Sequence, residues 1–256
     1  MNKLDQFISY KLILWRLIME IKDSYIFVTF GDSITRGIIY DDIKSKYEPL
    51  KENFTNIISN KIKGQVYNAG KFGNTIMRGA SKMYNDVIKK SPDIVLIEFG
   101  GNDCDYNWDD IAKNPDLEYK PNTDISTFRE TLLTMIDTLK TNHILPMLMT
   151  LPPLDPLKYF KWIAKENSSA EQNILHWLGT KDNIFNWHSS YNNIITEVAN
   201  ATNTVLIDVR SEFLKYSDYT QFLCKDGIHP NIGGQSLIAT VILKFMDDNY
   251  NFLLQP

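Results

Sequence analysis

The chain has 256 residues, of which 43% are hydrophobic and 12% aromatic, enough to bury a large core within one α/β domain. Its 27 basic and 31 acidic residues are spread along the sequence and give a formal net charge of -4. This pattern argues against a nucleic-acid surface, which needs clustered Lys and Arg. Cys104 and Cys224 are too few for a disulfide framework or a cysteine-based zinc site and fit a reducing compartment, with a single bridge left open.

The N-terminal segment is apolar enough to suggest a signal peptide or a membrane anchor. Lys11, Arg16 and Glu20 interrupt it every few residues, and no small-residue cleavage site follows before the next apolar run. We therefore expect an amphipathic element packed on the domain, no membrane span and a cytoplasmic protein. Secretion by an unrecognised route is the alternative.

Apolar runs and helix-length stretches alternate along the chain. The expected strands are 25–29, 64–70, 92–100, 143–150 and 203–209, and the expected helices are 48–63, 75–90, 124–142 and 189–201. In the third of these helices, apolar residues recur at helical spacing, namely Phe128, Leu132, Met135, Ile136 and Leu139. Alternating strands and helices predict parallel βαβ units, and continuous apolar strands such as "IVLI" predict a sheet covered on both faces. The fold class is therefore α/β, with a doubly wound, mainly parallel five-stranded sheet.

Polar residues follow the expected strands where each one ends. "GDSITRG" follows the first strand, "NAGKFGNT" the second and "GGND" the third, and "DGIHPN" precedes the last amphipathic segment. In a doubly wound sheet, function is expected in the crevice outside the carboxyl ends of the strands. Ser33 is placed there at the start of a helix, where free N–H groups and the helix dipole favour developing negative charge.

Together these four stretches resemble the SGNH/GDSL hydrolase family over residues 26 to about 245. Gly31-Asp32-Ser33 looks like the first block and Gly73 lies in the second. Gly100 to Asp103 form the third, and Asp226 with His229 the fourth. The only departure is Ile34, where the family's name has leucine. The resemblance implies a flavodoxin-like SGNH fold, no cofactor, and hydrolysis of carboxylic esters.

The implied roles also make chemical sense. A serine hydroxyl needs a base, which would be His229, and Asp226 can reach the other imidazole nitrogen and stabilise the imidazolium. The backbone N–H groups of Ser33 and Gly73 and the side-chain amide of Asn102 would form the oxyanion hole. Glycine suits the second of these positions because no side chain blocks close approach.

Each residue also has a purely structural interpretation. Ser33 could cap a helix, Gly73 could serve a tight turn, and Asn102 could hold a loop. Asp226 could belong to an ordinary turn, and His229 could be a surface histidine. Their joint occurrence at the ends of successive elements favours catalysis. The neighbouring aspartates of the first and third blocks are expected to be structural partners of the loops.

Other motifs are weaker. "GDSITRG" lacks the G-K-[ST] ending of a phosphate loop, and "DCDYNWDD" has Trp108 where a calcium loop needs glycine. His143, His176 and His188 show no paired ligand spacing, so no metal is predicted.

The segment 151–191 is rich in aromatic residues and carries no family-wide motif. Prolines at its start predict that it leaves the fourth strand as a loop. We expect a cap insertion in which most aromatics serve packing, while Trp187 and Tyr191 contribute to the substrate pocket.

The resulting prediction is a serine esterase acting through an acyl-enzyme on Ser33, with a short acyl chain or an acetylated sugar as substrate. A lysophospholipase, thioesterase or acyltransferase with the same residues is the first alternative, and a binding protein without catalysis is the second. Retention of the whole residue set speaks against the second alternative. The expected partner is a small ester, with no nucleic acid and a homo-oligomer left open.

Overall fold

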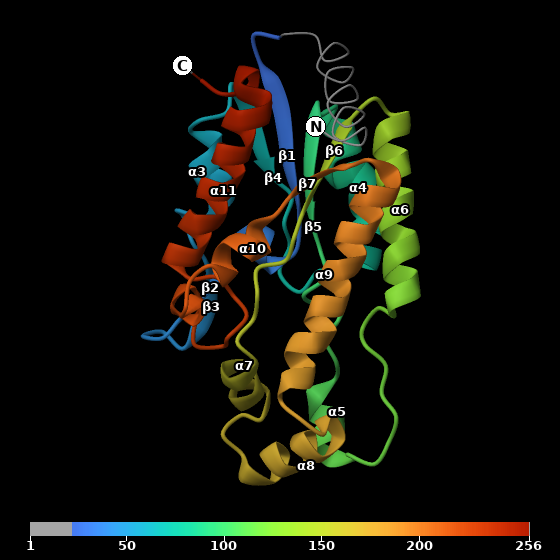
Figure 1. Ribbon diagram of the computed structural model, residues 1–256, viewed down its shortest axis with the longest axis vertical. Helices are drawn as coiled ribbons and strands as arrows, with labels where there is room; N and C mark the ends of the chain where they lie inside the picture. The colour runs from blue at the N-terminus through green and yellow to red at the C-terminus, as the bar shows by residue number, and fades with distance from the viewer. Residues whose placement is uncertain (1–21, 256) are drawn as a thin grey trace, which may run out of the picture.

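Five parallel strands form the centre of the computed structural model, which describes residues 22–255 (Figure 1). They are β1 (Tyr25–Gly31), β4 (Gly64–Asn68), β5 (Ile94–Glu98), β6 (Leu145–Met149) and β7 (Val205–Ile207). Their order in the sheet is β4-β1-β5-β6-β7, and every neighbouring pair is parallel. The predicted doubly wound sheet is thus confirmed. The expected amphipathic element at the N-terminus lies outside the described residues.

Helices cover both faces of the sheet, as Figure 1 shows. One face carries α4 (Ile76–Asp86), α6 (Ile125–Thr141) and α9 (Asp182–Thr202), and the other carries α3 (Phe54–Ser59), α10 (Val209–Leu214) and α11 (Ile232–Tyr250). Shorter helices are α2 (Ser33–Arg36), α5 (Trp108–Lys113), α7 (Pro156–Ile163), α8 (Ser168–Leu178) and the 3₁₀ turns η1 (Ile88–Lys90), η2 (Tyr219–Phe222) and η3 (Asn251–Leu253).

Strand β1 contributes side chains to both hydrophobic cores, one on each face of the sheet. Successive side chains of a strand point to opposite faces. Val28 and Phe30 join the core under α4, α6 and α9, whereas Tyr25 and Phe27 join the core under α3 and α11. All four side chains are fully buried. A continuous apolar strand is therefore required here, because neither face of the sheet is open to solvent.

The helical periodicity of 124–142 is confirmed, because all five apolar residues of that face are buried in α6. The expected helix at 48–63 is largely wrong. Only 54–59 is helical, and the preceding chain forms an antiparallel hairpin of β2 (Ile38–Asp41) and β3 (Lys46–Pro49). Two half-exposed strands of four residues give too short an alternation to be recognised from the sequence.

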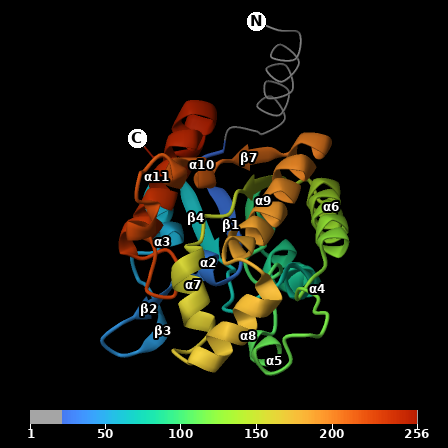
Figure 2. The ribbon, with the colours of Figure 1, turned by 60° about the horizontal axis from the view of Figure 1, so that its bottom comes forward.

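The segment 151–191 leaves β6 as a loop up to residue 155 and then forms α7, α8 and the start of α9. Its apolar residues pack with α5 around a third, smaller core that contains Ile111, Phe160 and Ile174. In Figures 1 and 2, α5, α7 and α8 lie together at one end of the molecule.

The strand order also locates the crevice. The connection after β1 leads to β4 on one side, and the next connection leads to β5 on the other side of β1. Such a reversal opens a crevice at the carboxyl ends of the two strands. Ser33 follows β1 and Asn102 follows β5, so both residues lie at this point.

Candidate active site

Ser33 is held at the first position of α2 by a tight turn after β1. The Asp32 side chain caps the helix, since its Oδ1 accepts a hydrogen bond from Ile34 N at 2.8 Å. At Gly31, a Cβ atom would lie only 2.2 Å from the Glu98 carbonyl oxygen and from Thr35 Oγ1. Only glycine therefore allows β1, β5 and the turn to approach this closely.

Ser33, His229 and Asp226 form a continuous chain of hydrogen bonds. His229 Nε2 lies 2.8 Å from Ser33 Oγ, and His229 Nδ1 lies 2.6 Å from Asp226 Oδ2. The other carboxylate oxygen of Asp226 accepts from the backbone N–H groups of Ile228 at 3.0 Å and His229 at 3.1 Å. All three side chains are buried, although Ser33 and His229 are 196 positions apart in the sequence.

A fourth residue, Tyr47 of β3, contacts this chain and was not predicted. Its hydroxyl donates to Asp226 Oδ2 at 3.0 Å, and its ring centroid lies 5.1 Å from that of His229. Burial alone would raise the pKa of Asp226, but the hydrogen bond from His229 and the charge of that residue hold the pKa below its ordinary value. Asp226 is thus suited to remain a carboxylate facing His229.

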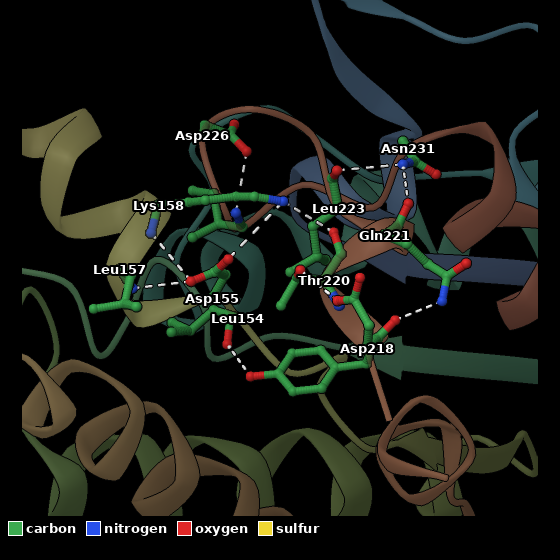
Figure 3. A network of polar contacts seen from close by, with 12 residues as sticks. Leu154, Asp155, Leu157, Lys158, Asp218, Thr220, Gln221, Leu223, Asp226 and Asn231 are labelled. Atoms are coloured by element: carbon green, nitrogen blue, oxygen red, sulfur yellow. Dashed lines mark hydrogen bonds and ion pairs between the residues drawn. The ribbon is translucent and has the colours of Figure 1, made fainter. Parts of the chain in front are cut away.

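The loop that carries Asp226 is joined to the start of α7 (Figure 3). Asp155 N donates to the Gly227 carbonyl oxygen at 2.8 Å, and Lys158 Nζ donates to the Thr220 carbonyl oxygen at 3.1 Å. On the other side, Asn231 Nδ2 donates to the Gln221 carbonyl oxygen at 2.8 Å. The segment after β6 therefore supports the same loop that positions Asp226 and His229.

The three predicted oxyanion donors lie around this crevice. Ser33 opens α2, so its N–H has no partner within the helix. The N–H of Gly73 makes no hydrogen bond within residues 22–255. Asn102 Nδ2 donates to Asp32 Oδ2 at 3.1 Å and to the Asn74 carbonyl oxygen at 3.2 Å. An oxyanion would thus replace one of these two longer contacts.

The reason expected for glycine at position 73 needs correction. A Cβ atom there would meet nothing within 4 Å, so space does not exclude a side chain. The residue has φ of +68°, in the left-handed region that glycine adopts without strain. The backbone conformation of the turn, rather than a close approach, favours glycine.

Asp32 and Asp103 serve the loops, as expected. Asp103 accepts from Ile76 N at the start of α4 and from Thr123 Oγ1, at 3.0 and 2.6 Å. Burial raises the pKa of Asp103 to about 6.

Glu98, at the end of β5, was not predicted from the sequence. Burial raises the pKa of both Asp32 and Glu98, and the proximity of the two carboxyl groups raises that of Asp32 further, so they retain a proton between them more readily than isolated carboxyls.

Two connected spaces adjoin Ser33 and His229. The more enclosed space is a cavity of about 60 Å³, whose walls combine polar side chains with apolar ones such as Leu154, Ile184 and Trp187. A more open cleft of about 380 Å³ is lined by the same two residues. Its rim carries aromatic side chains, namely Tyr47, Phe72, Tyr106, Trp108, Tyr159 and Trp162.

The two predicted pocket residues differ in outcome. Trp187 lines the cavity, in the same walls as Ser33. Tyr191 does not line either space. Its ring packs on Phe128 at 5.1 Å and its hydroxyl donates to the Thr123 carbonyl oxygen, so it belongs to the core between α6 and α9. The two residues lie one turn apart on the same face of α9, so they differ in their position along the helix axis, and the sequence could not show which turn borders the cavity.

Within residues 22–255, no group of three or more His, Cys, Asp or Glu side chains is arranged to hold a metal ion. In the same part of the chain, no helix combines the length and the apolar character needed to cross a membrane.

Comparison with known proteins gives a family match over most of the chain. Residues 29–237 match the GDSL-like lipase/acylhydrolase family. A curated relative, the uncharacterized lipoprotein YqeF of Bacillus subtilis (strain 168), is 27% identical over 193 residues, which cover 73% of this chain and 72% of that protein.

Solved structures share the fold. The lipase/acylhydrolase from Enterococcus faecalis superposes with a TM-score of 0.62 at 24% identity, covering 91% of this chain and 98% of that one. Axe2, an acetylxylan esterase from Geobacillus stearothermophilus, gives a TM-score of 0.59 at 20% identity, with coverages of 88% and 95%.

Proposed function

The chain belongs to the GDSL-like lipase/acylhydrolase family and is an ester-hydrolysing enzyme, and we propose that it acts as a serine esterase through an acyl-enzyme on Ser33. The observation that carries this proposal is the hydrogen-bond chain from Ser33 Oγ through His229 to Asp226. A serine hydroxyl becomes a useful nucleophile when a base within hydrogen-bond distance takes its proton.

In this mechanism, Ser33 Oγ attacks the ester carbonyl while His229 Nε2 takes the hydroxyl proton. Asp226 accepts the hydrogen bond from Nδ1 and stabilises the imidazolium that forms. His229 then passes the proton to the leaving alcohol, which departs and leaves the acyl group on Ser33. A water molecule, activated by the same histidine, releases the acid and restores the serine.

The tetrahedral intermediate is stabilised by the N–H groups of Ser33 and Gly73 and by the Asn102 amide. Two features support this assignment: the Gly73 N–H has no other acceptor within residues 22–255, and Asn102 borders both spaces that meet at Ser33. Asp32 accepts from the Asn102 amide and so orients it toward the crevice.

Asn102→Ala is expected to lower kcat by about 10²- to 10³-fold, because one preorganised donor to the oxyanion is lost. KM should change much less, since the donor acts mainly on charge that develops in the transition state. Steady-state kinetics on p-nitrophenyl acetate would measure both. Asn122→Ala is a suitable control, because that amide donates to the Asn102 carbonyl oxygen and is not in the crevice walls. A fall in kcat below tenfold for Asn102→Ala would contradict its role.

The substrate proposal follows from the two spaces. The cavity of about 60 Å³ has room for roughly four water-sized groups, at about 15 Å³ each, which favours a short acyl chain. The alcohol would leave through the wider cleft, whose aromatic rim suits a sugar ring or another flat, partly apolar group. The acetylxylan esterase with the same fold is consistent with an acetylated sugar as substrate.

Trp187→Ala is expected to shift the preferred acyl length upward by two or more carbons while leaving the fold intact, because Trp187 forms one wall of the cavity. Initial rates on p-nitrophenyl esters from acetate to octanoate would test this, beside wild type. Tyr191→Phe is the matched control, since that ring lies in the core away from the cavity. Unchanged selectivity in Trp187→Ala would argue against a cap role for 151–191.

The same series separates the alternatives. A wild-type optimum at eight carbons would favour a lipid hydrolase, and ester formation with an added alcohol would favour an acyltransferase. Binding without turnover would favour a non-catalytic protein.

A further inference from the structure

One buried histidine in the cavity wall is not used by the mechanism. His188 lies in α9, is only 4% exposed, and lines the same cavity as Ser33 and His229. The sequence pattern predicts no role for it, because it has no neighbour at metal-ligand spacing. Its surroundings define which of its ring nitrogens carries a proton.

Arg210 fixes the tautomer of His188. Arg210 Nη1 lies 3.1 Å from His188 Nδ1. A guanidinium group can only donate, so Nδ1 must accept and cannot carry a proton. The proton of the neutral ring is therefore on Nε2. Burial, reinforced by the charge of Arg210, lowers the pKa of His188 to about 3, so the ring stays neutral over the pH range of ordinary assays.

The Nε2–H group is a donor without an acceptor. No hydrogen bond of Nε2 occurs within residues 22–255, where the contact of the His188 ring is the one from Arg210. Nε2 is also not among the fully enclosed side-chain atoms that lack a partner. Since the side chain is almost wholly buried and lines the cavity beside Ser33, we infer that this cavity is the space that reaches Nε2. A buried donor of this kind favours a ligand that brings an acceptor.

Arg210 strengthens that donor from behind. Its guanidinium is buried, donates to Ser189 Oγ at 2.8 Å and lies 4.8 Å from the centre of the Phe185 ring. None of the ion pairs formed by the described residues includes Arg210. A positive charge on the far side of the imidazole makes Nε2–H a better donor toward the cavity.

Another side chain in the cavity wall disfavours anions. Asp105 lines the same space, and its Oδ1 accepts from Trp108 Nε1 at 2.6 Å and from Tyr159 OH at 2.7 Å. Burial raises the pKa of Asp105, the two donors oppose that rise by stabilising the carboxylate, and in its ionised form Asp105 would repel a carboxylate on the ligand. The remaining lining is largely apolar, so a small neutral group that carries one oxygen fits best.

We propose that His188 determines acyl specificity by donating its Nε2–H to a hydroxyl or keto oxygen on the acyl group of the substrate. This inference rests on the proposed esterase function and names its substrate class: short hydroxyacyl or oxoacyl esters are hydrolysed faster than alkyl esters of equal size. An acetyl group is shorter and has no such oxygen, so water rather than the substrate would accept the hydrogen bond from His188 Nε2–H.

The test compares isosteric ethyl esters in which a hydroxyl replaces a methyl group. Ethyl glycolate is paired with ethyl propionate, and ethyl 3-hydroxypropionate with ethyl butyrate; monoethyl succinate is the anionic probe. For each pair, pH-stat titration gives the ratio of kcat/KM for the hydroxy ester to kcat/KM for the alkyl ester. In at least one pair this ratio should be about tenfold higher for wild type than for His188→Leu, as expected for one buried hydrogen bond. Comparing the ratios between enzymes cancels the intrinsic reactivity of each ester.

Two variants separate this role from packing. His188→Gln can accept from Arg210 and donate to the substrate, so it should restore much of the preference. Ile184→Val changes the size of the same cavity without changing its polarity and should keep the preference. Thermal unfolding shows whether each variant is folded. An equal ratio in wild type and His188→Leu, or a preference for monoethyl succinate, would overturn the proposal.

A binding measurement keeps the inference separate from the esterase proposal. Ser33→Ala retains the cavity, and Trp108 and Trp187 in its walls report occupancy by fluorescence. Tighter binding of ethyl 3-hydroxypropionate than of ethyl butyrate to Ser33→Ala, lost in the double variant with His188→Leu, supports the role of His188 even if hydrolysis fails. Equal binding of the two esters overturns it even if p-nitrophenyl acetate is hydrolysed.

Discussion

Ser33→Ala is expected to lower kcat for p-nitrophenyl acetate by about 10⁴- to 10⁶-fold, leaving only the contribution of binding and the oxyanion donors. The reason is that no other hydroxyl lies within hydrogen-bond distance of His229 Nε2 among residues 22–255. Active-site titration with a slowly deacylating ester would complement the kinetics, because wild type should show a burst of one equivalent and the variant none.

The fold should tolerate this change well. The cap of α2 is made by Asp32 rather than by Ser33, and alanine is favourable in a helix. We expect the free energy of unfolding to change by less than about 1 kcal/mol. Ser81→Ala, at a solvent-exposed serine of α4, serves as the matched control and should keep full activity. Equal activity of wild type and Ser33→Ala would show that another residue is the nucleophile.

Asp226→Asn is expected to lower kcat by roughly 10⁴-fold at neutral pH, although the shape of the side chain is nearly unchanged. The Oδ1 position can still accept from the N–H groups of Ile228 and His229. The new amide would then present N–H to His229 Nδ1, which forces the imidazole proton onto Nε2. In that tautomer, the nitrogen facing Ser33 can no longer act as a base.

Tyr47→Phe is the matched control for Asp226→Asn. It removes one of the four hydrogen bonds to the Asp226 carboxylate but keeps the charge, the two backbone donors, the bond from His229 Nδ1 and the aromatic contact with His229. We expect a loss of less than about tenfold in kcat, equivalent to no more than about 1.4 kcal/mol. The losses in kcat of Tyr47→Phe and Asp226→Asn can be compared by measuring kcat of both variants and of wild type from pH 5 to pH 9. A loss in Tyr47→Phe as large as that in Asp226→Asn would mean that the hydrogen bond, rather than the charge, orients His229.

The buried carboxyl groups of Asp103, Asp32 and Glu98 make the free energy of unfolding depend on pH. The pKa of Asp103 is raised to about 6 by burial, so this group favours the folded state most at a pH below the unfolded value of about 4. That contribution declines as the pH rises toward 6. The neighbouring pair of Asp32 and Glu98, whose pKa values are also raised, changes stability in the same direction.

The sequence by itself was sufficient for the fold class and for the candidate residues, for identifiable reasons. Continuous apolar strands separated by amphipathic stretches allow few solutions other than a covered parallel sheet. The strand ends of such a sheet meet at one edge, so polar residues after "YIFVT" and "IVLIE" had to lie near one another. The match of four ordered motifs then connected Ser33 with His229 across 196 positions. Cytoplasmic location stays a prediction from the sequence.

Only the tertiary structure decided which other side chains meet these residues. Tyr47 reaches Asp226 through a short hairpin that lacks a clear periodic signal, and Glu98 lies under the turn because β1 and β5 are neighbours. Trp187 and Tyr191 share a face of α9 one turn apart, yet one lines the cavity and the other packs in the core, because different elements lie beside successive turns of the helix. A role for His188 could not be predicted from the sequence for the same reason. Its tautomer and its free Nε2–H donor follow from the contact with Arg210, which the fold brings from another helix. Local pattern determines the elements, whereas long-range packing determines the partners of each buried polar group.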